Sequence, residues 1–323
     1  MSRQARWYDS PVPNRRLSPC LLALFLFGCE AAPPDPGAVV LPGDDDDSAG
    51  DDDDATGDDD DATGPSGLTA WAVLLELETL GAGNTSLGHV SSAVASFGSG
   101  DPLPFGDPGV NGHLLPGAGL HPEQFDGEES CDTITASDAL DPLPASDPVG
   151  GVVHYEPATA APTLELEDTG GVYTWSEAAA LPASSYAIGV KGGAVWPPAS
   201  LDGALELPAP VSGFIQGPGG TISNLSVIEF RWTADSDPGG VEVIFFRWTT
   251  ANQTDWAAVR CRSADDGSVF MDASALAAGS GDITVTVSRA AWVTSGLQAG
   301  DQDVAAHAGA VRSVTWDLTP VGR

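Results

Sequence analysis

The sequence predicts an all-β protein, with one or two β-sandwich domains placed behind a disordered acidic tether. Three observations support this class. Apolar and polar residues alternate in several short segments, and Gly and Pro are dense between them, with 39 and 26 residues in a chain of 323. Beyond residue 67, no segment keeps an apolar period of 3.6 residues over the length of a helix.

The N-terminus has the pattern of a secretory signal. A polar stretch rich in arginine precedes the apolar run 21–27, and Gly28 and Cys29 follow this run. A basic region, a short apolar region and a small residue before the cleavage point define such a signal. The run is much shorter than the ~20 residues that a membrane-spanning helix needs. We therefore expect residues 1–28 to be a signal peptide.

The four residues Leu26, Phe27, Gly28 and Cys29 resemble the lipobox of bacterial lipoproteins. The resemblance implies that the Cys29 thiol carries a diacylglyceryl group and that the signal is cut just before it. Glu30 follows the anchor, and by resemblance to Gram-negative lipoproteins this favours the outer membrane. The alternative is an ordinary signal peptide with an incidental cysteine. An orientation towards the periplasm or the cell surface stays open.

Residues 29–66 are predicted to form a disordered tether. Several prolines are followed by three seven-residue repeats, each containing four consecutive aspartates. Adjacent carboxylates repel one another, and nothing apolar is present to bury. The repeats resemble the Asp-rich spacers of deltaproteobacterial and myxobacterial lipoproteins. Calcium binding by these aspartates is a second interpretation, but no Glu lies between Glu30 and Glu76 to complete an EF-hand loop.

The charge of the chain restricts its partners. Twelve Lys and Arg oppose 46 Asp and Glu, which gives a formal net charge of −34. Such a field repels nucleic acid and anionic lipid. We therefore expect no nucleic-acid partner, and cationic partners or divalent ions are the natural counter-charges.

The C-terminal part, residues 211–323, is predicted to be a β-sandwich of immunoglobulin-like or fibronectin-like size. Segments 228–232, 283–288 and 314–318 alternate apolar with polar residues, which is typical of a sheet with one buried face. Segment 241–248 is apolar on both faces except at Glu242 and Arg247, which indicates a central strand. The sequence Asp265-Asp266-Gly267 predicts a hairpin turn.

The preceding part, residues 67–210, is predicted to be a second β-rich domain with long loops. Candidate strands are 71–77, 151–156, 163–167, 172–175 and 186–191. A stretch rich in Gly, Pro and Asp, residues 98–148, shows little periodicity. The prolines near residue 210 suggest the boundary, although one larger unit remains an alternative.

Two cysteines remain in the predicted folded part, Cys131 and Cys261. An even number in an oxidising compartment predicts a disulfide. Such a bond would staple the two halves together or indicate a single unit. The alternative is two buried free thiols. Neither cysteine has a partner at zinc-like spacing.

Motifs for catalysis are missing from the sequence. It contains no H-E-x-x-H, no G-x-S-x-G and no phosphate-binding glycine loop. His113 and His121 share a loop with several acids, for which we prefer a solvated acidic loop over a metal or general-base site; the acids are Glu123, Asp126, Glu128 and Glu129. We expect no cofactor and assign no catalytic residue.

Two further groups of candidates concern ligands. Asp235, Asp237, Asp265 and Asp266 are oxygen ligands that suit calcium at the end of a sandwich, but their Gly and Pro neighbours favour turn residues. Trp196 and Trp256 lie near predicted loops, where exposed rings can stack on sugars.

The sequence as a whole favours a membrane-anchored envelope or surface lipoprotein with a non-enzymatic binding, adhesion or structural role. Its membrane contact would be the lipid on Cys29, and its ligand would be a protein or a glycan. A secreted hydrolase or a carbohydrate-binding accessory protein is the alternative, since a pair of catalytic carboxylates need not be close in sequence.

Overall fold

The structure is a computed structural model, and it describes most of the chain from Leu68 to Pro320. The described residues are 68–99, 108–110, 113–122, 124–136, 141–142, 152–168, 172–182, 185–191, 198–215, 217–222, 227–235, 239–253, 255–299 and 302–320. The predicted signal peptide and tether, with Cys29, lie outside them, as do Glu123, Trp196 and Asp237.

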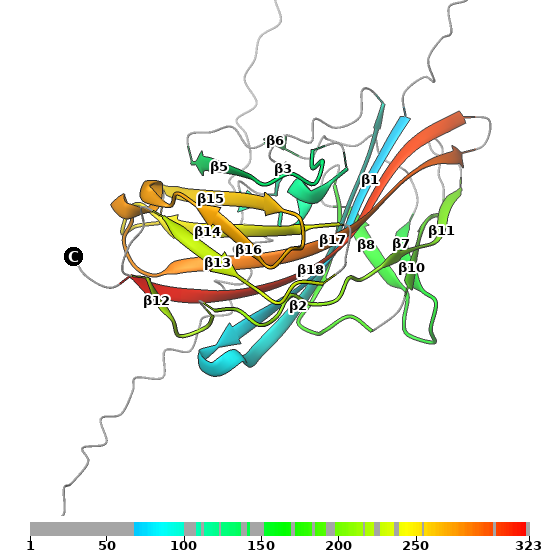
Figure 1. Cartoon of the computed structure of the whole chain (residues 1–323). Coiled ribbons are helices and arrows are strands. Elements are labelled where there is room, and N and C mark those ends of the chain that lie inside the picture. The colour runs from blue at the N-terminus through cyan, green and yellow to red at the C-terminus, as the bar shows by residue number, and fades with distance from the viewer. Residues whose placement is uncertain are drawn as a thin grey trace, which may run out of the picture.

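Four long strands form the centre of the molecule: β1 (Leu68–Gly81), β2 (Thr85–Ser99), β17 (Ile283–Ala299) and β18 (Gln302–Pro320). The order is β2-β1-β18-β17, and β1 runs parallel to β18. Figure 1 shows β17 and β18 extending along the molecule from one end to the other. They belong to a 13-stranded sheet that includes strands from both sides of residue 210.

Five strands extend this sheet beyond β2: β7 (Val153–Pro157), β8 (Leu164–Asp168), β9 (Tyr173–Glu177), β10 (Ser185–Val190) and β11 (Ala199–Glu206). The sheet curls, so that β11 returns to contact β17 and β18. A first core fills the curl. It contains Tyr155, Tyr186 and Leu205 from the outer strands and small residues, chiefly alanines, from β1, β2 and β18.

The other end of the molecule is a sandwich. On the far side of β17 the large sheet continues through β14 (Val241–Trp248), β15 (Trp256–Ser263) and β5 (Ser130–Thr135). The two-stranded sheet of β13 (Ile228–Arg231) and β16 (Ser268–Met271) supplies residues to the same core, while β12 (Thr221–Ile222) pairs with the end of β18. This second core contains Phe230, Phe245 and Trp316.

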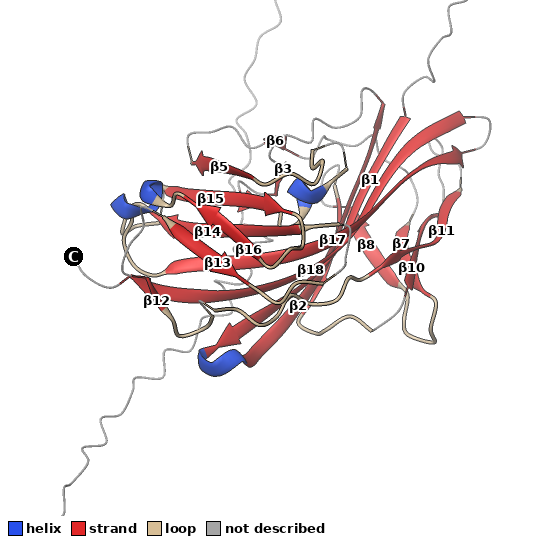
Figure 2. Ribbon diagram, viewed as in Figure 1, coloured by secondary structure: helices blue, strands red, loops and turns tan. Residues whose placement is uncertain are grey.

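The remaining described elements are short. They are the 3-10 turns Ala82–Asn84, Ala118–Leu120 and Ser274–Ala278, and a small sheet of β3 (Pro108–Val110), β4 (His113–Leu114) and β6 (Asp141–Pro142). Within the described residues no α-helix occurs, and strands dominate Figure 2. The all-β, sandwich-like class that the sequence predicts is therefore confirmed.

One face of β18 serves both cores in succession, because alternate residues of a strand point to the same side. Ala306, Ala308 and Ala310 belong to the first core, whereas Val314 and Trp316 belong to the second. Arg312 lies between the two sets. The same change occurs on β17 at Arg289, which is the register partner of Arg312.

Four polar residues in register therefore separate the cores; we call Ser91, Glu76, Arg312 and Arg289 the polar row. Arg312 Nε lies 3.0 Å from Glu76 Oε1. Arg289 Nη2 lies 2.7 Å from Asp265 Oδ2, and the side chains of this pair are only 3% and 1% exposed. Charges at this depth need such partners, because burial without compensation is costly.

The polar row also holds the two connections that cross it. After β9, Leu181 donates its backbone N–H to Glu76 at 2.7 Å, and Ser91 donates to the carbonyl of Ala179 at 2.6 Å. The proline-rich connection between β11 and β12 is bound from the other side. There Arg312 donates to Pro208 O at 3.1 Å, and Arg289 donates to Ala209 O and Pro210 O at 3.2 Å.

Several strand predictions agree with the structure, and one turn prediction is wrong. Segment 241–248 is β14, and it is central, between β15 and β17. The turn at Asp265-Asp266-Gly267 does not close a hairpin, because β15 pairs with β14 and β5, whereas β16 pairs with β13. The turn instead carries the chain from one sheet to the other. The boundary between residues 210 and 211 stays a prediction.

Replacing Arg289 tests the polar row. Arg289→Met leaves Asp265 buried without its cation, so we expect the free energy of unfolding to fall by ~3–5 kcal/mol. Arg231→Met is the matched control, since Arg231 and its partner Glu229 are both partly exposed and should cost less than ~1 kcal/mol. Urea unfolding followed by tryptophan fluorescence measures both. Equal losses would contradict a special role for the row.

Candidate functional site

The candidate site is a group of buried ionisable side chains on the face of the central strands opposite the first core. Residues 115–126, which we call the cover segment (residue 123 is outside the described part), pack on this face. Leu115, Ala118 and Leu120 contribute to a third apolar cluster with Trp71 and Val311. Five ionisable residues lie next to this cluster: Glu242, Arg260, Arg262, His121 and His307.

Glu242 fixes the turn of the cover segment. It is fully buried, and its carboxylate accepts hydrogen bonds from the backbone N–H groups of Gly117 and of Gly119, the latter at 3.2 Å. Burial raises the pKa of Glu242, whereas Arg260, the Gly117 N–H and Arg262 act in the opposite direction. The carboxylate oxygens are thus bound by backbone donors, and the positive charges of the two arginines favour the ionised form.

Both glycines are required by geometry. Gly117 has a φ of +76°, in the left-handed region that side chains rarely adopt, and an added Cβ would lie 2.5 Å from Val311. At Gly119 an added Cβ would lie 2.4 Å from Glu242 Oε1. The segment consequently approaches the sheet as closely as its backbone allows.

Two histidines form the second contact beneath the cover segment. His121 Nε2 lies 3.1 Å from His307 Nδ1, and neither side chain is accessible to solvent beyond a few per cent. Burial and the neighbouring His307 lower the pKa of His121 to about 4. The Trp292 ring meets His121 edge-on at a centroid distance of 4.9 Å. One imidazole donates to the other, so the ring that accepts must be uncharged, because a protonated imidazole has no acceptor nitrogen.

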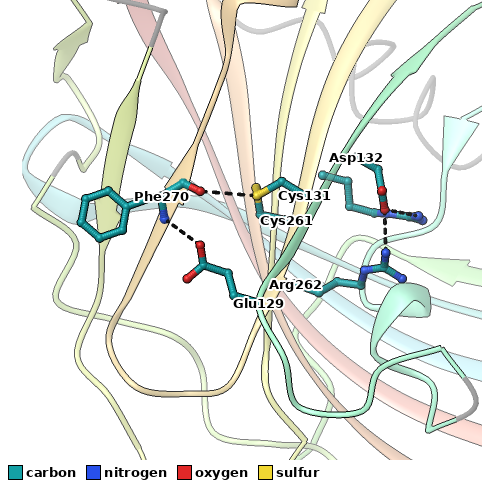
Figure 3. Close-up of a disulfide and its surroundings, with 7 residues drawn as sticks. Glu129, Cys131, Asp132, Cys261, Arg262 and Phe270 are labelled. Carbon is teal, nitrogen blue, oxygen red and sulfur yellow. Dashed lines mark hydrogen bonds and ion pairs between the residues drawn. A yellow bond between two sulfur atoms is a disulfide. The ribbon is translucent and has the colours of Figure 1, made fainter.

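A disulfide lies at the edge of the sheet close to Arg260 and Arg262. Cys131 of β5 and Cys261 of β15 are register partners and are bonded, which confirms the predicted disulfide. Next to the disulfide, Asp132 forms ion pairs with two arginines (Figure 3). Its Oδ2 lies 2.6 Å from Arg262 Nη2 and 3.5 Å from Arg260 Nη2. On the other side, Cys131 Sγ lies 3.6 Å from the carbonyl oxygen of Phe270. The bond fastens an edge strand from the N-terminal half to the C-terminal sheet.

The prediction of a solvated loop is wrong for His121. We expected a solvated acidic loop, but His121 is fully buried, because the cover segment folds onto the sheet. Asp126, Glu128 and Glu129 are exposed, and Asp126 accepts the backbone N–H of Glu128 at 3.0 Å. The side chain of His113 lies outside the described part.

The calcium and sugar candidates occupy different environments. Asp265 accepts a hydrogen bond from Trp232 Nε1 at 2.6 Å on one oxygen and from Arg289 Nε on the other. Both of its oxygens therefore have protein partners. Asp266 accepts the N–H of Ser268 at 3.2 Å in the turn, and Asp235 lies exposed, 3.9 Å from Arg289. Trp256 is buried on β15 against Phe246, and not on a loop.

A small opening occurs in the described part of the chain. An apolar cavity of about 20 Å³ lies inside the first core, between alanines of β1 and β18 and aliphatic side chains of β10 and β11. This is roughly the space of one water molecule. Among the described residues, no three His, Cys, Asp or Glu side chains converge as metal ligands would.

The buried network was only partly visible in the sequence. Glu242 and Arg247 interrupt an apolar strand, and this signal marks Glu242 as a residue that needs partners. Arg260 and Arg262 lie on the neighbouring strand β15, whereas the backbone donors of the cover segment come from more than a hundred positions earlier in the chain. His307 carried no local signal, since it lies in a run of Ala and Gly.

Comparisons with known proteins give little. No protein-family model matches the chain, and no curated protein matches it. Among solved structures, the FN1–FN3 domains of chicken CNTN1 align with 75% of this chain and 65% of their own length, at 7% identity and a TM-score of 0.19. The Yersinia pseudotuberculosis adhesin InvE aligns with 76% of this chain and 58% of its own length, at 10% identity and a TM-score of 0.14.

The chain therefore spans less than two thirds of the length of either solved structure. Similarity at this level adds nothing to what the sheets show directly. In the described residues, no helix has the length and apolarity needed to cross a membrane.

Acid should loosen the cover segment. The pKa of His121 is about 4 in the folded chain and ordinarily 6.5, so the unfolded chain binds the extra proton first as the pH falls. The contribution to stability is complete above pH 6.5 and is lost progressively towards pH 4, by up to ~3 kcal/mol. We expect His121→Gln to remove this part of the pH dependence, as measured by urea unfolding between pH 7 and pH 4.

Glu242 acts in the opposite direction, because its raised pKa favours the folded state as the pH falls. The difference between the wild-type and His121→Gln profiles isolates the histidine contribution, since Glu242 is common to both. Parallel profiles would show that His121 does not titrate as the buried pair requires.

Replacing Gly119 tests how closely the cover segment approaches Glu242. Gly119→Ala places a methyl group against the Glu242 carboxylate, so we expect a loss of about 1–3 kcal/mol in the free energy of unfolding. Gly88→Ala is the matched control on β2, because nothing lies within 4 Å of the added carbon. If the two variants unfold at the same urea concentration, the approach to Glu242 is looser than described.

Proposed function

We propose that the protein is an envelope lipoprotein with a non-enzymatic binding or adhesion role, anchored in the outer membrane by lipid on Cys29 and displayed on the tether of residues 29–66. The support for the anchor is the lipobox-like sequence and the spacer that follows it. The support for binding, as opposed to catalysis, comes from how the folded part uses its ionisable groups.

The observation that carries the proposal is the placement of the cations. Of the described arginines, Arg247, Arg260 and Arg289 are buried, and Arg262 and Arg312 expose only 13% and 19% of their side chains. Each is bound to carboxylates or to backbone carbonyls. Arg247, for example, donates to Leu276 O at 2.8 Å and to Gly281 O at 2.9 Å.

The surface is consequently anionic. Among the described residues, the cations that remain well exposed are Lys191 and Arg231, and each is paired with a glutamate. A surface of one sign steers oppositely charged partners and repels similar ones. The proposed partner is therefore a protein or glycan assembly that presents positive charge or bound divalent ions.

The alternative of a hydrolase or a sugar-binding accessory protein has less support. It depends on exposed loop tryptophans or on two carboxylates facing a cleft. Trp256 is buried, and Glu242, the buried carboxylate of the candidate site, is occupied by backbone donors. We therefore place binding first.

The anchor is tested by replacing its thiol. We expect Cys29→Ala to move the protein from the membrane fraction to the soluble fraction of cells, whereas the wild type stays with the membrane. Cys20→Ala is the matched control, because Cys20 lies within the predicted signal and should leave with it. Equal membrane retention of all three would contradict lipid anchoring at Cys29.

Two further measurements address orientation and binding. Protease treatment of intact cells removes the protein if it faces outward and spares it if it faces the periplasm. Purified mature protein should bind immobilised basic proteins in preference to acidic ones, and the binding should weaken as salt rises because exposed charges are screened. Binding that is indifferent to both charge and salt would overturn the anionic surface as the recognition element.

A further inference from the structure

The first and last long strands of the fold are direct neighbours. β1 runs parallel to β18 with an unbroken register of twelve pairs, from Leu68 with Val304 to Thr79 with Thr315. Figure 1 shows the two strands side by side at the centre of the molecule. We call this contact the seam. The chain preceding the seam is the predicted tether, and the far end of β18 lies in the C-terminal sandwich.

From this geometry we infer that the seam is a mechanical clamp, which carries load between the tether and the C-terminal sandwich. The inference rests on the proposed function, because the anchor on Cys29 supplies one of the two points of attachment. The other point is the sandwich, whose core includes Val314, Trp316 and Leu318 of β18. A partner held there pulls on β18 while the membrane pulls on β1.

The direction of load decides how the seam responds. The tether pulls Leu68 backwards along β1, and the sandwich pulls β18 forwards along the same axis. Since the strands are parallel, these forces slide one strand past the other, so all the evenly spaced hydrogen bonds of the ladder are loaded together. Forces that separate two strands from one end load the bonds one at a time, which needs less force.

Water is kept from the seam on both faces. The first core covers one side of β1 through Ala70, Ala72 and Leu74. On the other side Trp71 and Val73 lie in the cluster beneath the cover segment. A shielded ladder resists load better, because water cannot readily replace each strained backbone hydrogen bond. The Glu76–Arg312 ion pair also joins the strands directly.

The disulfide adds a limit to extension. Cys131 and Cys261 are separated by 130 positions, and the intervening chain forms a covalently closed loop. If the seam opens, this loop cannot lengthen, so the distance between tether and sandwich grows only by the residues outside it. The bond thus protects the central part of the chain after the clamp yields.

Single-molecule force measurements on the mature chain test the clamp. One pulling geometry attaches handles at the tether and at the C-terminus, which loads the seam in shear. The second attaches a handle at Ser86→Cys, an exposed position beyond the end of β1, and at the C-terminus, which opens the seam from its Thr79 end. We expect the rupture force to be about twofold or more higher in the first geometry, at the same loading rate. Equal forces would overturn the clamp.

Two sets of variants sharpen the result. Glu76→Gln should lower the rupture force in the shear geometry, whereas Glu165→Gln, which removes the exposed partner of Lys191 away from the seam, should leave it unchanged. The double variant Cys131→Ser with Cys261→Ser should extend further by roughly 450 Å, at ~3.5 Å for each of the 130 released positions. An unchanged extension would overturn the limit.

The outcomes separate the two proposals. A high shear force together with membrane release of Cys29→Ala supports both. A low shear force with intact anchoring overturns the clamp and leaves the lipoprotein proposal standing. A high shear force without anchoring at Cys29 shows a clamp to which the membrane is not attached, and so overturns its role in carrying load from the anchor.

Discussion

The ion pairs of Arg289 and Arg312 are the constraint on which the arrangement of the two cores depends. Each arginine lies where its strand leaves one core and enters the next, and each is bound to a carboxylate and to the connection between β11 and β12. Apolar residues at these positions would merge the two cores. A charged row with fixed partners instead requires the connections to pass over it at defined points.

The same logic explains why so few cations face solvent. A chain with twelve basic residues and 46 acidic ones has little positive charge to distribute. The structure places most of the described arginines where a buried carboxylate or carbonyl needs a donor. The acidic exterior is therefore a consequence of how the interior is held together, as well as of composition.

Local pattern predicted the local structure well and the long-range structure poorly. Segment 241–248 became β14 with both ends correct, since its apolar run is a local signal. By contrast, β2 was not predicted, because its Ser, Gly and Ala give no alternation, although its alanines pack well in the first core. The turn at Asp265 was read as a hairpin because turn chemistry does not reveal which strands will pair.

The candidate site shows the same division. Glu242 was marked by its place in an apolar strand, but its donors at Gly117 and Gly119 lie more than a hundred residues earlier. The disulfide followed from an even number of cysteines, which is a count and not a pattern. His307 and the parallel pairing of β1 with β18 have no local signature, because both depend on the order in which distant strands assemble.

The pairing of β1 with β18 also affects when the central sheet can be completed after synthesis. Among the described strands, β1 is synthesised first and its partner β18 last. The β1–β2 hairpin can form early, but one edge of β1 has no strand to pair with until nearly the whole chain is available. Parallel contacts between such distant segments form slowly, and an unpaired apolar edge invites association with other chains. Chaperones that hold the growing chain apart would matter more for this protein than for one whose neighbouring strands are consecutive.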